Sequence, residues 1–367
     1  MGLLDLRMQY FRMARRALVE GRLGWLAKTA AKTLVVPLSH LARRPLGGPV
    51  MANLVPTYRC NNDCFMCDLP KPSLYARRGT DELDTRSLCA IIDDLAAIGV
   101  VGLSLAGGEP TLRPDCFELL AHGKRRGLFV HLNTNGYNLH QEARMAELLA
   151  AEPASMNVSL DGATAETHDR VRRARHGFER IERLTELWRR HPDPKPSLTY
   201  TFVFGPDNFH EVPALLELAR KREVTSVSFN PLTFVYEGAK PIPRDTLAAM
   251  DVMIDWLRDE KAHADDPEFI DNSDAFLSLF PRAYRGEPSP LKCYVGYHNV
   301  VVDAYGNVYP CTVTYQRGEA IGNVRGRSLV ELWRSDEYQR KREQLVGCTD
   351  CLWNCHTEIN LLYQRPG

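Results

Sequence analysis

The sequence predicts an α/β fold: a partial (β/α)6 barrel of the TIM type, preceded by a helical arm and followed by a small α+β domain. Between positions 53 and 230, short runs rich in β-branched and aromatic residues alternate with longer runs of helical periodicity. This alternation is typical of parallel βαβ units. The predicted strands are Asn53–Tyr58, Val101–Ala106, Leu128–Thr134, Ser155–Leu160, Leu198–Phe204 and Val224–Asn230.

Helical periodicity covers the segments between these strands and one segment after them. The predicted helices are Asp84–Ile98, Cys116–Arg126, Gln141–Ala150, Gly177–Arg190, Glu211–Arg222 and Arg244–Glu260. Pro, Gly and Asp then become frequent over 265–290, where we place a domain boundary. We therefore expect an arm over residues 1–50, a barrel over 51–285 and a C-terminal domain over 286–367.

The C-terminal domain begins with a predicted hairpin. Its strands are Asn299–Val302 and Asn307–Tyr309, and Gly306 lies in the turn between them. A helix near Ser328–Gln344 and a cysteine-rich tail follow.

Charge is balanced over the whole chain but not along it. The 46 basic and 46 acidic residues give no net field that favours nucleic acid. Residues 1–50, however, hold nine Lys or Arg against Asp5 and Glu20, interleaved with apolar residues at helical spacing. Such an arm binds a membrane surface, or caps the barrel with its charges solvated. We see no secretion signal and expect the cytoplasm, at the inner membrane surface if the arm binds lipid.

Three of the ten cysteines lie just after the first predicted strand, as Cys60-x3-Cys64-x2-Cys67. In a reducing compartment this clustering favours metal over disulfides. Three thiolates leave one iron of a 4Fe-4S cubane without a protein ligand. Zinc is the alternative, but structural zinc sites prefer four ligands and no histidine is close to these cysteines in sequence.

This cysteine motif resembles that of the radical S-adenosylmethionine (SAM) superfamily, and later motifs follow in the order of that family. Residues 107–110, Gly-Gly-Glu-Pro, are similar to the family's GGEP motif. The resemblance implies a SAM-binding 4Fe-4S cluster on Cys60, Cys64 and Cys67. Met66 departs from the aromatic residue that the family has before the third cysteine, which weakens the expected adenine contact. The SAM-binding residues implied by the resemblance are Gly107, Gly108, Glu109, Asn133, Asn135, Ser159, Asp161 and Arg172.

The remaining clustered cysteines resemble those of the SPASM and Twitch domains, which hold auxiliary clusters. Cys293 and Cys311, with Gly306 five positions before Cys311, match that spacing. Five cysteines suffice for a single auxiliary 4Fe-4S cluster, held by Cys293, Cys311 and two of Cys348, Cys351 and Cys355. The alternative is a zinc ion on Cys348, Cys351, Cys355 and His356. Cys89 and Cys116 lie on predicted helices, and we assign them to the core.

By resemblance, the chain is an enzyme that cleaves SAM reductively to a 5′-deoxyadenosyl radical, with electrons from a partner such as flavodoxin or ferredoxin. A single auxiliary cluster favours a small-molecule, sugar or lipid substrate that is oxidised, epimerised or joined through a new C–C bond. The alternative is maturation of a ribosomally made peptide, and a third hypothesis is a non-catalytic iron–sulfur or zinc sensor. The sequence identifies no catalytic acid or base.

Overall fold

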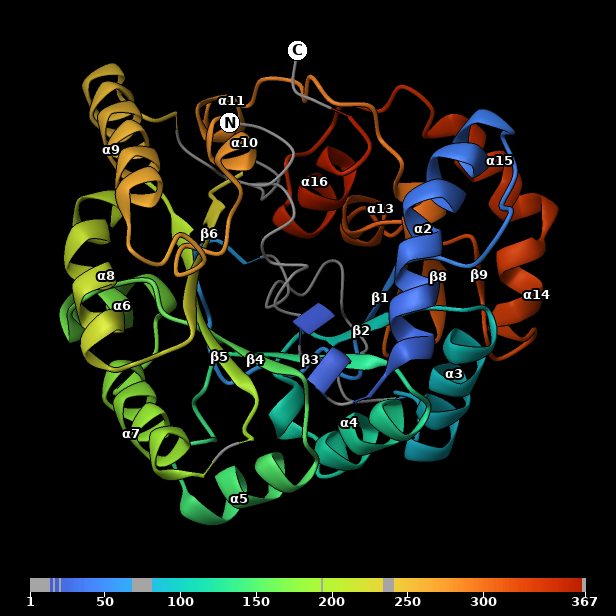
Figure 1. The fold of residues 1–367 in the computed structure, drawn as a ribbon, viewed down its shortest axis with the longest axis horizontal. Helices are drawn as coiled ribbons and strands as arrows, with labels where there is room; N and C mark the ends of the chain where they lie inside the picture. Colours follow the sequence, from blue (N-terminus) through green and yellow to red (C-terminus); the bar gives the residue numbers. More distant parts are fainter. Residues whose placement is uncertain are drawn as a thin grey trace.

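Six parallel strands form the predicted barrel wall in the computed structural model, which describes residues 14–15, 17–19, 21–67, 81–192, 194–233 and 241–364 (Figure 1). The strands are β1 (Met51–Leu54), β2 (Gly102–Leu105), β3 (Phe129–Thr134), β4 (Ser155–Ser159), β5 (Ser197–Phe204) and β6 (Ser226–Pro231). Each pairs in parallel with the next along the chain. The predicted α/β fold is therefore confirmed.

Alternation of side chains along the strands separates an outer from an inner face. In β1, Ala52 and Leu54 are buried in the main hydrophobic core, whereas Asn53 between them is half-buried. In β4, Met156 and Val158 belong to that core and Asn157 between them is half-buried. The apolar residues pack against the helices on the outer face, and the polar residues line the inner face.

The helices cover the outer face in an arc that follows the chain (Figure 1). They are α3 (Thr85–Ala97), α4 (Cys116–Arg125), α5 (Glu142–Ala150), α6 (Ala165–Arg172), α7 (Gly177–Arg190) and α8 (Val212–Lys221). Helix α3 begins where Asp84 accepts a hydrogen bond from the Ser87 amide (2.8 Å), a standard N-cap. Short helix α6 was not among the predicted helices.

The C-terminal segments complete the wall. Strand β7 (Asn299–Val302) pairs in parallel with β1, and β8 (Asn307–Tyr309) and β9 (Gly322–Asn323) continue the sheet in antiparallel fashion. The predicted hairpin is thus present, but it extends the barrel sheet. This pairing joins positions almost 250 residues apart, and no local pattern indicates it. The predicted domain limits stay a prediction.

The other C-terminal helices are α9 (Arg244–His263), α10 (Asp274–Leu277), α11 (Phe280–Tyr284), α12 (Val295–His298), α13 (Thr312–Gln316), α14 (Leu329–Arg334), α15 (Asp336–Gln344) and α16 (Asn354–Leu361). Of these, α10, α11, α13 and α16 lie between β6 and β8, α9 lies beside α8, and α14 and α15 lie on the side of α3 (Figure 1). The single helix predicted near Ser328–Gln344 is divided at Ser335, whose side chain caps α15 through the Tyr338 amide.

The described part of the arm is dominated by α2 (Leu23–Leu41), which lies against the N-terminal ends of the strands. The indole of Trp25 donates to the Val101 carbonyl just before β2 (2.9 Å). Residues 1–13 of the predicted arm lie outside the described part of the chain. Within the described ranges, no helix has the length and apolar character needed to cross a membrane.

Candidate functional site

The first thiol group, Cys60, Cys64 and Cys67, lies on the loop that leaves the C-terminal end of β1. Cys60 is exposed, Cys64 is buried and Cys67 is half-buried, and none of the three forms a disulfide. The amide of Cys67 donates to the Cys64 carbonyl (3.1 Å), which closes a turn between the last two cysteines. The loop thus begins at the end of the barrel where βα loops carry function.

Gly107 and Gly108 let the next loop approach the base of the cysteine loop. A Cβ on Gly108 would lie 2.2 Å from the Arg59 carbonyl oxygen, and Gly107 has a positive φ of 126°. The amides of Gly108 and Glu109 donate to the carbonyls of Thr57 (3.0 Å) and Arg59 (2.7 Å). The loop that contains Gly107 and Gly108 therefore hydrogen-bonds to the backbone just before Cys60. This contact is separate from the predicted contact with SAM.

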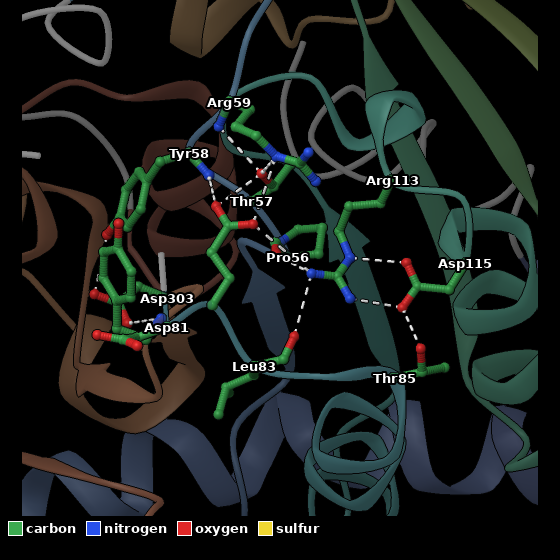
Figure 2. A network of polar contacts seen from close by, with 12 residues as sticks. Pro56, Thr57, Tyr58, Arg59, Asp81, Leu83, Thr85, Arg113, Asp115 and Asp303 are labelled. Atoms are coloured by element: carbon green, nitrogen blue, oxygen red, sulfur yellow. Dashed lines mark hydrogen bonds and ion pairs between the residues drawn. The ribbon is translucent and has the colours of Figure 1, made fainter. Parts of the chain in front are cut away.

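A polar network holds the other side of the same segment (Figure 2). Glu82 accepts hydrogen bonds from the Thr57 hydroxyl (2.8 Å) and the Tyr58 amide (3.0 Å). Arg113 forms a two-pronged pair with Asp115 (2.6 and 2.8 Å) and also donates to the Pro56 carbonyl (3.2 Å). Buried charges are tolerated when paired in this way, and the network fixes the backbone three positions before Cys60.

Glu109 lies below the surface and connects two of the loops. Its carboxylate accepts hydrogen bonds from the Thr111 hydroxyl (2.6 Å), the Thr134 hydroxyl (2.7 Å) and the Asn135 amide (2.7 Å). Burial raises the pKa of Glu109, although these donors favour the charged form. The side chain is 1% exposed, so its place in this structure is that of a support for the loops around it.

Arg172, at the end of α6, reaches the first thiol group. Its Nε donates to Asp161, and its Nη1 lies 3.8 Å from the Cys64 sulfur. Asp161 is fully buried and also accepts from the Val203 amide (2.7 Å), so it fixes the guanidinium from behind. Two predicted SAM-binding residues and one predicted cluster ligand are thereby brought together.

Asn135 is a second nitrogen donor to this group. Its Nδ2 lies 3.9 Å from the Cys60 sulfur and donates to the Asn61 side chain (2.7 Å). Asn133 points into a row of inner-face side chains, where it donates to Ser104 (2.6 Å) and accepts from Asn157 (3.0 Å). Ser159 ends β4, half-buried. Asn133 is thus placed along the barrel interior, while Asn135 is placed beside the thiols.

The second thiol group, Cys293, Cys311, Cys348, Cys351 and Cys355, gathers where β8, α12 and the start of α16 meet. Cys293, Cys311 and Cys351 pack in one apolar cluster with Val295, Val313, Leu345 and Trp353. A hydrogen bond from the Cys293 thiol lowers the pKa of Cys348 to about 6, and burial raises that of Cys351 to about 12.

Cys355 is exposed as a residue, but its thiol faces Thr312 and Cys311, and burial raises its pKa to about 12. All five thiols are free.

His356 is engaged through one ring nitrogen, and its other nitrogen, Nδ1, is buried without a hydrogen-bond partner among the described residues. Its Nε2 accepts the Thr312 amide (3.2 Å) and lies 3.1 Å from the Thr312 hydroxyl. Burial lowers its pKa to about 4. Within the described ranges, no three His, Cys, Asp or Glu side chains converge on one ion. A single zinc ion needs such convergence, whereas a cubane spreads its thiolates over four irons. The second thiol group offers five thiols, a donor set that suits an iron–sulfur cluster.

A group of tyrosines lies between the two thiol groups. Tyr58, two positions before Cys60, and Tyr309, two positions before Cys311, both donate to Asp303 (2.9 and 3.0 Å). Tyr315, just after Cys311, stacks parallel to Tyr58 with ring centroids 6.0 Å apart. Asp303 lies in the β7–β8 turn, so this turn ties the two thiol groups into one unit.

Sequence reasoning missed these supporting residues. Glu82, Arg113, Asp303 and Tyr58 belong to no motif that carries chemistry. The one local signal was Arg113-x-Asp115, a spacing that lets both side chains meet after a tight turn. The rest depends on which strand ends become neighbours.

Comparison with known proteins agrees with this arrangement. The family model described as "Radical SAM superfamily" matches residues 54–219, and the SPASM model, an iron-sulfur cluster-binding domain, matches residues 293–355. Among solved structures, Streptococcus suis SuiB bound to precursor peptide SuiA superposes with a TM-score of 0.60 at 19% identity, over 81% of this chain and 67% of that one.

Curated relatives match about four fifths of the chain. Mycofactocin maturase MftC of Mycobacterium ulcerans is 30% identical over 304 residues, 81% of this chain and 76% of the relative. PqqA peptide cyclase of Rhodopseudomonas palustris is 29% identical, covering 79% and 75%. AdoMet-dependent heme synthase of Methanosarcina barkeri is also 29% identical, covering 80% and 86%. The chain belongs to the radical SAM superfamily and carries a C-terminal SPASM iron–sulfur cluster-binding domain.

Proposed function

We propose that this radical SAM enzyme modifies a peptide, using a SAM-binding 4Fe-4S cluster on Cys60, Cys64 and Cys67. The observation that carries the site assignment is the convergence of these thiols with the Arg172 guanidinium, 3.8 Å from Cys64. When bound, a reduced cluster and SAM supply a radical that removes a hydrogen atom from the substrate. The chain's own residues must bind SAM, orient it and keep water from the site.

Arg172 is suited to bind the SAM carboxylate. A guanidinium presents five donors in a planar fork, and here Asp161 takes Nε. The ion pair with Asp161 restricts rotation of the Arg172 guanidinium, so its orientation is fixed before SAM binds. We assign Arg172 and Asn135 to contact with the cofactors, and Asp161 and Glu109 to positioning.

The second thiol group is proposed to hold one auxiliary 4Fe-4S cluster. Four of its five thiols would ligate the cluster, and one would remain spare. Cys293 and Cys311 are assigned as ligands, with two of Cys348, Cys351 and Cys355. A one-electron donor such as flavodoxin or ferredoxin would reduce the enzyme. Anaerobic reconstitution should give about eight irons per chain, and about four would leave only one cluster.

Two lines support a peptide over the small molecule, sugar or lipid that the cysteine count favours. The maturase and the peptide cyclase named above match 81% and 79% of the chain. In addition, the inner face of the wall offers uncharged amides and hydroxyls, in the pairs Asn53–Asn299 and Ser104–Asn133. Amides carry donors and acceptors together, as a peptide backbone does.

Coexpression tests this proposal. The full chain is produced with each short open reading frame near its gene, and mass spectrometry then searches the peptides for loss of hydrogen or a new cross-link. Coexpression with the C64A variant is the control. We expect one peptide to be modified only with the native chain. If the purified chain forms 5′-deoxyadenosine from SAM but modifies none of these peptides, the enzyme class stands and the peptide proposal is wrong.

A further inference from the structure

Helix α2 carries a continuous apolar stripe on its outer side. The stripe consists of positions that repeat at intervals of three or four residues and share one helical face: Leu23, Ala27, Ala30, Leu34, Leu38 and Leu41. All six are exposed, and the four leucines are 51% to 80% exposed. We call this surface the outer leucine stripe.

The opposite side of α2 is firmly packed, so the exposure does not come from a loosely attached helix. The Trp25 indole donates to the Val101 carbonyl (2.9 Å), and the Lys32 ammonium donates to the Gly48 carbonyl (2.6 Å). Arg22 donates to the Gly127 carbonyl (2.6 Å) and lies over the Phe129 ring. These contacts fix the helix and hold the stripe facing outward.

The charges that α2 and the loop after it carry have one sign: Arg43 and Arg44 follow the end of the stripe, and Lys28 lies near Lys32 on the flank of the helix. Residues 21–50 contain no Asp or Glu. Of their five Lys and Arg residues, Arg22 and Lys32 are used in the internal contacts above, whereas Lys28, Arg43 and Arg44 are exposed. Basic side chains beside an exposed apolar stripe complement an anionic lipid surface, which offers negative headgroups above an apolar layer.

A second copy of the chain fits this face less well. Packing two stripes together would bring Arg43 and Arg44 of both copies near each other. Residues 21–50 hold no acidic side chain, and Glu343, which accepts from Gln339 beside Arg43, adds one nearby carboxylate per copy, so basic side chains would still outnumber acidic ones. Like charges placed together in this way oppose association. We propose that the outer leucine stripe docks the enzyme on an anionic membrane surface.

The position of α2 gives this docking a defined geometry. The helix contacts residues at the N-terminal ends of β2 and β3, whereas the first thiol group leaves the C-terminal end of β1. The membrane would therefore lie at the end of the barrel opposite the thiols. Docking would place the enzyme at the membrane and leave its catalytic end facing away, so it does not by itself deliver a lipid substrate.

Vesicle sedimentation of the full chain tests the proposal. The probes are vesicles of phosphatidylcholine alone and of phosphatidylcholine with phosphatidylglycerol. We compare the native chain with a stripe variant (Leu34→Gln, Leu38→Gln, Leu41→Gln) and a charge variant (Lys28→Gln, Arg43→Gln, Arg44→Gln). The control is Val252→Gln, because Val252 is 69% exposed on α9, away from this surface.

We expect the native chain and the Val252 variant to bind anionic vesicles alike. The charge variant should bind on the order of 100-fold more weakly, at about fivefold for each basic residue. The stripe variant should lose binding while keeping its thermal unfolding midpoint, since the replaced side chains are exposed. Added salt should weaken native binding.

Equal binding of native chain and stripe variant would overturn the proposal, as would equal binding to neutral and anionic vesicles. A native dimer in light scattering that the stripe variant converts to a monomer, without vesicle binding, would assign the stripe to a second copy instead.

Discussion

The two thiol groups are built in opposite ways. The first, Cys60, Cys64 and Cys67, lies on a loop among polar partners, with Arg172 and Asn135 within 4 Å of its sulfurs. In the second, Cys293, Cys311 and Cys351 pack among valine, leucine and tryptophan side chains, Cys348 lies near Asp350 and Arg317, and the thiols interact with one another.

The difference suits two cluster sites with different requirements, one that must admit SAM and one that is ligated by protein alone. A cluster that must accept SAM needs an open side lined with hydrogen-bond donors. Its loop is therefore fixed on the other side, by backbone hydrogen bonds from Gly108 and Glu109 and by the Glu82 carboxylate. A cluster ligated only by protein needs no access, and apolar packing can enclose it.

Replacing Cys64 with Ala should abolish formation of 5′-deoxyadenosine, because the first thiol group would then hold two thiols. The measurement is chromatography of the products after reconstitution with SAM and dithionite. Cys89→Ala is the matched control, since Cys89 lies on α3 away from both groups, and it should retain activity. Retained SAM cleavage in the Cys64 variant would remove the first thiol group from the mechanism.

Replacing Arg172 with Ala should destabilise the fold by about 3–5 kcal/mol, because it leaves the fully buried Asp161 without its cation. SAM affinity should fall as well. Urea unfolding and isothermal titration with SAM measure the two effects. The control Arg170→Ala removes an exposed pair with Asp207 (3.7 Å) and should cost less than about 1 kcal/mol. Equal losses in both variants would contradict the supporting role of Asp161.

Glu358 anchors the helix that carries Cys355, and it should make stability depend on pH. It accepts the amide and hydroxyl of Ser273 (2.9 and 2.8 Å), and burial raises its pKa to about 7. The folded state therefore holds a proton that the unfolded chain releases near pH 4.3. Stability from this group is full below pH 4.3 and falls by about 3 kcal/mol as pH rises to 7.

Urea unfolding between pH 4.5 and 8 under reducing conditions measures this slope. The Glu358→Gln variant should lose that part of the slope, and Glu217→Gln, at an exposed position on α8, should keep it. An unchanged slope in the Glu358 variant would assign the pH dependence to other groups.

Tyr58→Phe should lower stability by about 1.5–3 kcal/mol, the smallest of these effects apart from the Arg170 control, because its hydroxyl donates to a buried carboxylate. It is the most informative substitution for the link between the regions. Since Asp303 also binds Tyr309 beside Cys311, the electron paramagnetic resonance spectra of both clusters should change. A change confined to the first cluster would show that the tyrosine group does not couple the two sites.

Much of the fold followed from local patterns. Alternating strand and helix signals predicted the barrel strands, and the turn at Gly306 predicted the hairpin. The pairing of β7 with β1 could not be predicted, since it depends on which sheet edge stays open. The single long helix predicted after Ser328 failed because a serine at position 335 caps a new helix.

The candidate site divides in the same way. Cysteine spacing and Gly-Gly-Glu-Pro are local and pointed to the site directly. Residues such as Glu82 and Asp303 act through partners that become neighbours only when the barrel forms. Gly108 shows a role beyond the one that the resemblance implies: its predicted contact with SAM stays a prediction, and the structure also packs it against the Arg59 carbonyl.

Electron paramagnetic resonance of two reduced variants tests most directly whether the first thiol group is open to SAM and the second is closed. One lacks Cys60, Cys64 and Cys67, and the other lacks Cys293 and Cys311. Adding SAM should shift the spectrum of the variant that keeps the first group and leave the other unchanged. A SAM-dependent shift in the variant that keeps only the second group would contradict the account.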